Sequence, residues 1–350
     1  MSTEVPGNAW HLAIDLGSAL EQRGVEVVLA VFGRKLSEAQ RRAARRISTL
    51  SLEEFPLKVE WMEDSREDVE ESGRALRALA ERTEPDVVQV ESYAHGALRF
   101  GVPLVVAPHT DLMSWWARRQ PRPLAASFPD YQARARRGLH GAQAVVASTR
   151  WALDELTRAY GPLAHAQVIA PGCDVHKFEP ARKEKLVLTA SRAWDGARNL
   201  ALLAQVAADL PWPVLAMSDD TRAPVPLPAC ETRGLRVLGE RSREELSENL
   251  ARASIFALPA SLDPSGLSVL EAALAGCALL LGDEPALRER WEGAARFVPP
   301  DDAGALHEAL TRLIGEPETC DELGMRARER ALGFGSDACA EAYLALYRAL

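Results

Sequence analysis

Two carboxylates, Asp263 and Glu271, lie on either side of a turn that contains Gly266. The pattern predicts a helix beginning near Leu267, so the backbone N–H groups of Gly266, Leu267 and Ser268 should lie at a helix N-terminus. Unpaired N–H groups and the helix dipole favour a phosphate there. Glu271 could accept hydrogen bonds from two vicinal hydroxyls, as a ribose offers, and Asp263 could do the same for a sugar ring. The segment favours a site for an anionic, hydroxyl-rich ligand over a capped helix with a solvated face.

A second candidate is a pair of arginines near the start of the second half of the chain. Arg192 follows a predicted strand over residues 185–190, and Arg198 opens the next predicted helix. Two guanidinium groups converging at a strand end suit a diphosphate, through their charge and their fork geometry. A pair of solvated surface arginines explains the pattern equally well.

A third candidate follows the predicted strand at residues 103–107. His109 comes just past the end of that strand, where its side chain would project into a ligand crevice, although a lone histidine is more often structural. Asp111, Trp115 and Trp116 follow closely. Aromatic faces beside a carboxylate are usual in sugar binding, and two tryptophans are also ordinary core residues, so these three are candidate acceptor contacts.

The elements that must position these residues are short β-branched runs alternating with amphipathic segments. Such alternation predicts an α/β fold with parallel sheets covered by helices on both faces. The first predicted helix spans residues 9–23 and the last spans 336–350. The predicted strands fall at residues 25–32, 57–60, 86–90, 103–107, within 139–147 (AQAVVA) and at 167–171, and then at 185–190, 213–218, 235–238, 255–258 and 278–281.

The domain organisation follows from a loop rich in proline and charge at residues 172–185, where we place a boundary between two doubly wound halves. Their strand C-termini, and therefore their ligand crevices, should lie along an interdomain cleft. The first half lacks an obvious opening strand, because the turn at Gly7 and Asn8 arrives almost at once. We expect a late start site, since loss of a central strand would leave unpaired backbone groups.

Composition excludes several classes of protein. A chain of 350 residues exceeds the usual size of one hydrophobic core. A net charge of −9 argues against a broad nucleic-acid footprint. Five cysteines without a close pair fit a reducing compartment, and neither a disulfide framework nor a zinc site. No apolar run reaches membrane-spanning length and no signal peptide is apparent, so we expect a cytoplasmic protein.

The segment around Asp263 and Glu271 resembles the E-x7-E region of retaining glycosyltransferases of family 4 (glycosyl transferases group 1), which have the GT-B fold. Asp263 stands in place of the usual first glutamate, and Glu271 matches the second. The resemblance implies that Glu271 holds the ribose and that backbone near Gly266 and Leu267 meets the donor.

Other family positions are matched along the chain. Arg192 and Arg198 stand where the family has an arginine and a lysine, and His109 stands where members carry a histidine beside the donor sugar. Gly7 and Asn8 resemble an N-terminal glycine pair that approaches donor phosphate or acceptor. The resemblance also places Tyr93 and His95 in a loop that faces the cleft, as candidate acceptor contacts.

The resemblance implies two Rossmann-like domains facing an interdomain cleft. Residues 1–172 would form the acceptor-side domain with its first strand missing, residues 173–335 the nucleotide-sugar-binding domain, and residues 336–350 a helix crossing back to the first domain. The implied activity is retaining transfer of a hexosyl-type sugar from a nucleoside diphosphate sugar to a glycan, lipid-linked or small-molecule acceptor.

The implied mechanism needs no metal and no cofactor other than the donor itself. Arg192, Arg198 and the helix dipole would stabilise the departing nucleoside diphosphate, while Asp263 and His109 orient the sugar. Two rival interpretations stay open: another nucleotide-sugar enzyme on the same fold, such as an epimerase, and a catalytically degenerate module that only binds nucleotide-sugar.

Overall fold

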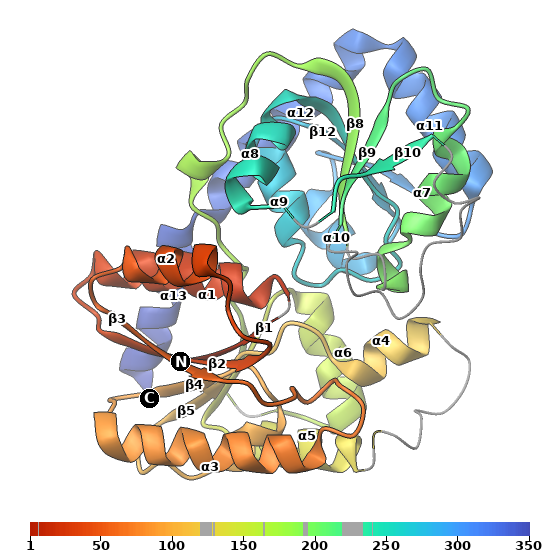
Figure 1. Ribbon diagram of the computed structural model, residues 1–350. Helices are drawn as coiled ribbons and strands as arrows, with labels where there is room; N and C mark the ends of the chain where they lie inside the picture. The colour runs from red at the N-terminus through yellow and green to blue at the C-terminus, as the bar shows by residue number, and fades with distance from the viewer. Residues whose placement is uncertain are drawn as a thin grey trace. The chain divides into compact units, whose positions relative to one another are not determined.

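The computed structural model describes residues 1–5, 7–119, 128, 130–163, 165–191, 195–218, 234–239 and 241–350. The chain divides into two compact units (Figure 1). The first comprises Met1–Gly172 together with Ser336–Leu350, and the second comprises Cys173–Gly335. Every sheet within them is parallel, which confirms the predicted α/β class.

The first unit contains a three-stranded sheet in the order β1-β2-β3 and a four-stranded sheet in the order β4-β5-β6-β7. Its strands are β1 (Ser2–Val5), β2 (Val27–Gly33), β3 (Leu50–Phe55), β4 (Val88–Val90), β5 (Leu104–Val106), β6 (Ala144–Ala147) and β7 (Ala166–Val168). Its helices are α1 (Ala9–Glu21), α2 (Glu38–Arg45), α3 (Arg66–Thr83), η1 (Ala94–Ala97), α4 (Leu112–Arg119), α5 (Tyr131–Gly141), α6 (Arg150–Tyr160) and α13 (Ser336–Ala349).

Strand β2 shows why these sheets are covered on both faces. Its sequence is almost continuously apolar, as expected of a strand buried on both sides. Leu29 packs with α1 and α13 in one hydrophobic cluster, whereas Phe32 packs with α3 and α5 in another. Successive side chains point to opposite faces of a strand, so one apolar run supplies both clusters. Figure 1 shows α1, α2 and α13 on one side of the unit and α3 and α5 on the other.

The opening strand of this unit is present, which corrects the prediction that it is missing. β1 pairs with β2 from Ser2 opposite Ala30 onward. Its short polar sequence hides it, because Ser2 and Thr3 are buried side chains in a position normally apolar. Their hydroxyls are satisfied by Glu91 after β4: Thr3 Oγ1 donates to Glu91 Oε1 at 3.1 Å, and the Glu91 N–H donates to Ser2 Oγ at 3.2 Å.

The third strand is displaced from its predicted position. The sequence predicts a strand at residues 57–60, which is wrong, because β3 spans Leu50–Phe55 and pairs with β2. β3 is the outer strand of its sheet and is largely half-buried. Its mixed polar and apolar residues suit an edge strand and give no continuous apolar run.

The second unit is a six-stranded sheet in the order β10-β9-β8-β11-β12-β13. Its strands are β8 (Glu184–Ala190), β9 (Val214–Met217), β10 (Leu235–Val237), β11 (Ala253–Leu258), β12 (Ala278–Gly282) and β13 (Arg296–Val298). Its helices are η2 (Val175–Lys177), η3 (Gly196–Arg198), α7 (Leu200–Ala207), α8 (Arg243–Arg252), α9 (Leu267–Leu274), α10 (Pro285–Trp291), α11 (Ala303–Gly315), α12 (Pro317–Ala331) and η4 (Leu332–Phe334).

Helix α9, which contains Glu271, is buried along its whole length. It follows β11, whose Ile255 and Ala257 pack with α7 and α11 on the opposite face of the sheet (Figure 1). At its C-terminal end, Lys183 Nζ donates to the Ala275 carbonyl at 2.6 Å, which satisfies a carbonyl that the helix leaves unpaired. The helix is therefore enclosed along its length and hydrogen-bonded at its C-terminal end.

No helix in the described ranges combines the length and the apolar character needed to cross a membrane.

Candidate active site

The turn before α9 is closed by Asp263. One carboxylate oxygen, Oδ1, accepts from the Gly266 N–H at 3.1 Å and from the Ser265 hydroxyl at 3.3 Å. Gly266 is the N-cap residue with φ 56°, a left-handed conformation that glycine adopts without a Cβ clash. The Gly266 N–H, predicted to meet phosphate, is thus already paired. The N–H groups of Leu267 and Ser268 bond to no described residue, so an anion could bind there.

Arg198 and Asp263 are brought together, as expected for residues of one site. Arg198 Nη1 lies 2.7 Å from Asp263 Oδ2, and both side chains are almost fully buried. The same nitrogen lies 3.3 Å from Ser268 Oγ. Asp195 is a more distant carboxylate, with Oδ2 at 3.8 Å from Arg198 Nε. A guanidinium, a carboxylate and a hydroxyl therefore meet at the N-terminus of α9. Arg192 lies outside the described residues.

Glu271 is buried in the second turn of α9 and is already paired with a cation. Its Oε1 accepts from Arg243 Nη2 at 2.9 Å, with only 4% of the Glu271 side chain exposed. The Arg243 guanidinium lies over the Phe178 ring at 5.4 Å from the centroid. Arg243 is the first residue of α8, whose N-terminus is closed by a capping box between Ser242 and Glu245. No sequence pattern marks it as a site residue, because its pairing with Glu271 depends on two helices meeting in space.

A second buried arginine, Arg290, is hydrogen-bonded to the loop that precedes α9. Arg290 Nη1 donates to the Ser265 carbonyl at 2.6 Å, and its guanidinium lies 4.7 Å from the Phe334 ring centroid. Arg290 is 5% exposed. A Cβ added at Gly266 would come within 3.3 Å of Arg290 Nη1. The loop is thus held by two buried arginines, Arg198 on Asp263 and Arg290 on Ser265.

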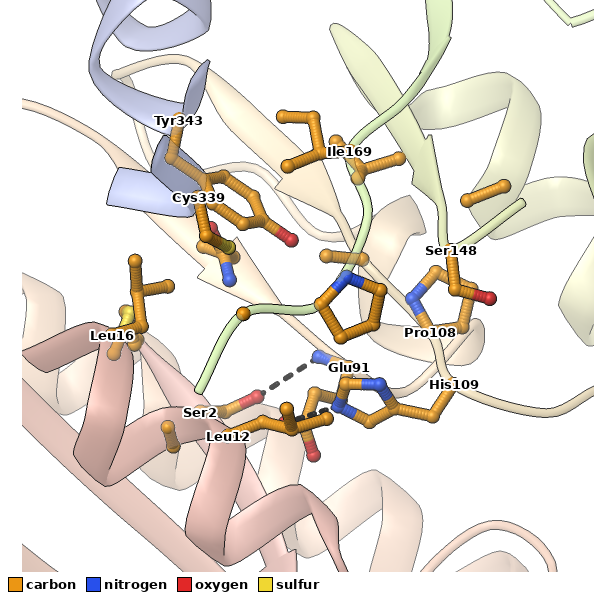
Figure 2. A pocket seen from close by; sticks show the side chains of 18 of the residues that line it. Ser2, Leu12, Leu16, Glu91, Pro108, His109, Ser148, Ile169, Cys339 and Tyr343 are labelled. Carbon is orange, nitrogen blue, oxygen red and sulfur yellow. Dashed lines mark hydrogen bonds and ion pairs between the residues drawn. The ribbon is translucent and has the colours of Figure 1, made fainter. Parts of the chain in front are cut away.

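In the first unit, His109 lines a cavity of about 40 Å³. His109 Nε2 lies 3.0 Å from Glu91 Oε1, and the two residues follow β5 and β4, whose carboxyl ends share one edge of the sheet. Figure 2 shows the imidazole beside Glu91, with Ser2 bonded to the Glu91 backbone. Gln89, Ser148 and other residues also line the cavity, among them Leu12, Leu16, Ile169, Cys339 and Tyr343.

Three of the predicted acceptor contacts are core residues, which corrects that prediction. Tyr93 and His95 are each 4% exposed. His95 Nε2 lies 2.8 Å from Ser72 Oγ, and burial lowers the pKa of His95 to about 4. Asp111 is 6% exposed, and its Oδ1 accepts from the hydroxyls of Tyr131 and Tyr160 at 3.1 and 2.6 Å. The three side chains are enclosed by the interior and present no open face to a sugar.

The remaining predicted residues lie nearer the surface. Trp115 and Trp116 are half-buried on α4, with ring centroids 6.4 Å apart. Asn8 is the N-cap of α1 and makes no side-chain capping bond, and Gly7 has φ 147°. Among the described side chains, no group of three or more histidine, cysteine or acidic residues could hold a metal ion.

Comparison with protein families gives two matches. Residues 10–177 match the model described as Glycosyltransferase Family 4, and residues 231–330 match Glycosyl transferases group 1. The second match contains Arg243, Asp263, Gly266 and Glu271. Most of the residues around the start of α9 thus lie within the second matched segment, while Arg198 precedes it.

A curated relative is D-inositol 3-phosphate glycosyltransferase of Kineococcus radiotolerans, which is 32% identical over 117 residues. The match covers 31% of this chain and 27% of that protein, so it spans about a quarter of the relative's length.

Solved structures resemble the chain over nearly its whole length. Sucrose-phosphate synthase from Thermosynechococcus elongatus gives a TM-score of 0.79 at 17% identity, covering 95% of this chain and 91% of that one. HepE from Anabaena, in complex with UDP and glucose, gives a TM-score of 0.75 at 14% identity, covering 100% and 99%. This likeness shows the GT-B fold. The two family matches, which together cover residues 10–177 and 231–330, show that the chain belongs to the family 4, group 1 glycosyltransferases.

Proposed function

We propose that this protein transfers a glycosyl residue from a nucleoside diphosphate sugar to a hydroxyl-bearing acceptor, with retention at the anomeric carbon. The acceptor belongs to the glycan, lipid-linked or small-molecule classes. The reaction relies on arginines and backbone N–H groups to balance the leaving-group charge, without a metal.

The observation that carries the proposal is the cluster at the start of α9. Arg198 Nη1 lies 2.7 Å from Asp263 Oδ2 and 3.3 Å from Ser268 Oγ. The N–H groups of Leu267 and Ser268, which bond to no described residue, lie beside them at the positive end of the helix dipole. A diphosphate is an anion of the right kind for such a place, and Glu271, one turn further along, supplies acceptors for ribose hydroxyls.

The roles divide along the donor. Leu267, Ser268 and Arg198 hold the diphosphate and stabilise its charge as the glycosidic bond breaks. Glu271, kept as an anion by Arg243, accepts from the ribose. Asp263 and His109 orient the sugar. The complex of HepE with UDP and glucose supports a nucleoside diphosphate sugar as donor, since that protein shares the fold.

The experiment is a transfer assay with UDP-, GDP- and ADP-sugars and a panel of acceptors. Release of nucleoside diphosphate, the mass of the product and the anomeric coupling constant of the new linkage would be measured. Wild type is compared with Glu271→Gln, and with Glu308→Gln as a control on an exposed face of the same unit. Loss of one charged hydrogen bond costs about 2 kcal/mol, which predicts a roughly 30-fold lower kcat/KM for Glu271→Gln only.

Each rival has its own result. Conversion of the donor sugar to its epimer without acceptor would identify an epimerase. Donor binding with neither transfer nor slow hydrolysis would identify a degenerate binding module. Inversion in the product would overturn the stereochemical part of the proposal while leaving the transferase intact.

A further inference from the structure

The imidazole of His109 is held by one contact. Its Nε2 lies 3.0 Å from Glu91 Oε1, and no other described residue bonds to it. The His109 side chain is 27% exposed, whereas the Glu91 side chain is 9% exposed. The histidine therefore has one ring nitrogen fixed by a buried carboxyl group and its other nitrogen, Nδ1, without a described partner.

The Glu91 oxygen that contacts His109 also accepts a hydrogen bond from a second group. Thr3 Oγ1 donates to Oε1 at 3.1 Å, and Oε1 is the oxygen that lies 3.0 Å from His109 Nε2. Oε1 therefore acts as an acceptor at this position.

An oxygen that acts as an acceptor selects the tautomer of a neutral imidazole that faces it, because the facing ring nitrogen must then donate. In that tautomer His109 carries its proton on Nε2, and Nδ1 is an acceptor. We propose that Glu91 is a positioning residue that fixes His109 in this tautomer, so that Nδ1 accepts a hydrogen bond from one hydroxyl of the transferred sugar. This inference rests on the proposed function and names a residue outside the family resemblance.

The second carboxylate oxygen of Glu91, Oε2, belongs to a residue that lines the same cavity as His109. Glu91 Oε2 is buried and has no hydrogen-bond partner among the described residues. An unpaired buried acceptor is costly, so Oε2 requires a donor. The adjoining cavity of about 40 Å³ can hold a few water molecules, each of which needs about 10–15 Å³, but not a sugar ring. The cavity therefore has room for water beside Oε2 but none for the sugar, which would meet the exposed edge of His109.

The direct test is the tautomer of His109, read from imidazole ¹⁵N chemical shifts in the full chain without ligand. Wild type should show the Nε2–H form. Glu91→Gln replaces the carboxylate with an amide that can donate, and the Nδ1–H form should gain. Thr3→Val removes the second donor to Oε1 and should loosen the preference, while Thr3→Ser retains it. Glu81→Gln, an exposed change in the same unit, should leave the tautomer unchanged.

The kinetic test uses donors that each lack one sugar hydroxyl. In wild type, one deoxy donor should lose about 10-fold or more in kcat/KM, the effect expected of one lost hydrogen bond to a buried polar partner. With the intact donor, Glu91→Gln should lower kcat/KM by a similar factor relative to wild type. Replacing the intact donor with that deoxy donor should then lower kcat/KM of the variant little further. Affinity for free UDP, GDP or ADP should not change, because the nucleotide contacts lie in the second unit.

Three outcomes would overturn the proposal: an Nδ1–H tautomer in wild type, an unchanged tautomer in a folded Glu91→Gln, or equal sensitivity of both proteins to every deoxy donor. The tautomer is measured without donor, so its result stands if no sugar transfer is found. Absence of transfer together with the Nε2–H tautomer would reject the proposed function but not the positioning of His109 by Glu91.

Discussion

Arg198 and Asp263 form a buried ion pair at the start of α9, with Nη1 and Oδ2 separated by 2.7 Å. The sequence suggests separate tasks for them, a diphosphate for Arg198 and a sugar for Asp263. In the structure the two side chains pair with each other, and Asp263 also closes the turn by accepting from the Gly266 N–H. The carboxylate therefore maintains the loop and balances a cation that a diphosphate could later share.

Asp263→Asn should lower stability and increase the response to nucleotide. The change removes the carboxylate that balances the buried Arg198, and among the described residues Asp195 is then its nearest counter-charge, at 3.8 Å. Breaking a buried ion pair in this way costs about 3 kcal/mol. A bound diphosphate restores an anion beside Arg198, so the rise in Tm with saturating nucleoside diphosphate should exceed that of wild type. Thermal melts with and without nucleotide check this. Asp209→Asn, an exposed change in the same unit, is the control. A smaller nucleotide-induced rise in Tm in the variant than in wild type would mean that Arg198 does not contact the diphosphate.

Arg243→Met should weaken nucleotide binding through the ribose. The methionine keeps an apolar stem over Phe178 but removes the cation 2.9 Å from Glu271. A buried carboxylate without its cation takes up a proton more readily and loses an acceptor. The dissociation constant should rise about 10-fold. Calorimetry should show that removing the ribose diol from the nucleotide weakens binding to wild type but weakens binding to Arg243→Met little further.

The control for that experiment is Arg252→Met, at the exposed end of the same helix. If Arg243→Met retained the full penalty for a missing diol, Glu271 would not depend on Arg243 to bind the ribose.

Gly266→Ala can be compared with a matched glycine. Gly266 and Gly293 both have positive φ, at 56° and 79°, so alanine at either should cost about 1–2 kcal/mol. Only at Gly266 does the new Cβ approach another group, Arg290 Nη1 at 3.3 Å; at Gly293 nothing lies within 4 Å. Denaturation should show similar losses of stability, while nucleotide affinity falls only in Gly266→Ala. Equal affinities in the two variants would mean that the loop does not contact the donor.

The second unit was the more predictable half, for a physical reason. Strands β8, β11 and β12 are buried apolar runs between turn residues, and such runs are visible in the sequence. β1 and β3 were missed or misplaced because Ser2 and Thr3 are buried polar residues and β3 is a half-exposed edge strand. Their formation depends on partners distant in the chain.

The site shows the same division. Asp263 and Ser268 belong to a turn and a helix that are adjacent in sequence, whereas Arg198 lies 65 residues before Asp263 and follows β8, the strand that pairs with β11. Arg243 and Arg290 reach the site through tertiary packing, which no local pattern reports. Glu91 had a usable signal, since it directly follows β4 and His109 follows the neighbouring β5. Asp111 looked like a sugar ligand because Tyr131 and Tyr160, which bury its carboxylate, are far away in sequence.

The buried histidine predicts a pH dependence of stability in the first unit. Burial lowers the pKa of His95 in the folded state to about 4 from 6.5, so the unfolded chain binds the proton first as pH falls. Stability should be lost as pH falls from about 6.5 towards 4, by about 2 kcal/mol between pH 7 and pH 5. Urea denaturation at both pH values should show a smaller difference in His95→Gln. His165→Asn, an exposed histidine in the same unit, should behave as wild type. An unchanged difference in His95→Gln would assign the acid sensitivity to other groups.

A nucleoside diphosphate bound at the start of α9 with its ribose on Glu271 can be detected by calorimetric titration. UDP, GDP and ADP would each be titrated into wild type, Glu271→Gln and the exposed control Glu308→Gln. We expect selective binding of one nucleotide, weakened about 10-fold or more by Glu271→Gln and unaffected by Glu308→Gln. A folded wild-type protein that binds none of the three, or a Glu271→Gln variant that binds as tightly as wild type, would contradict this expectation.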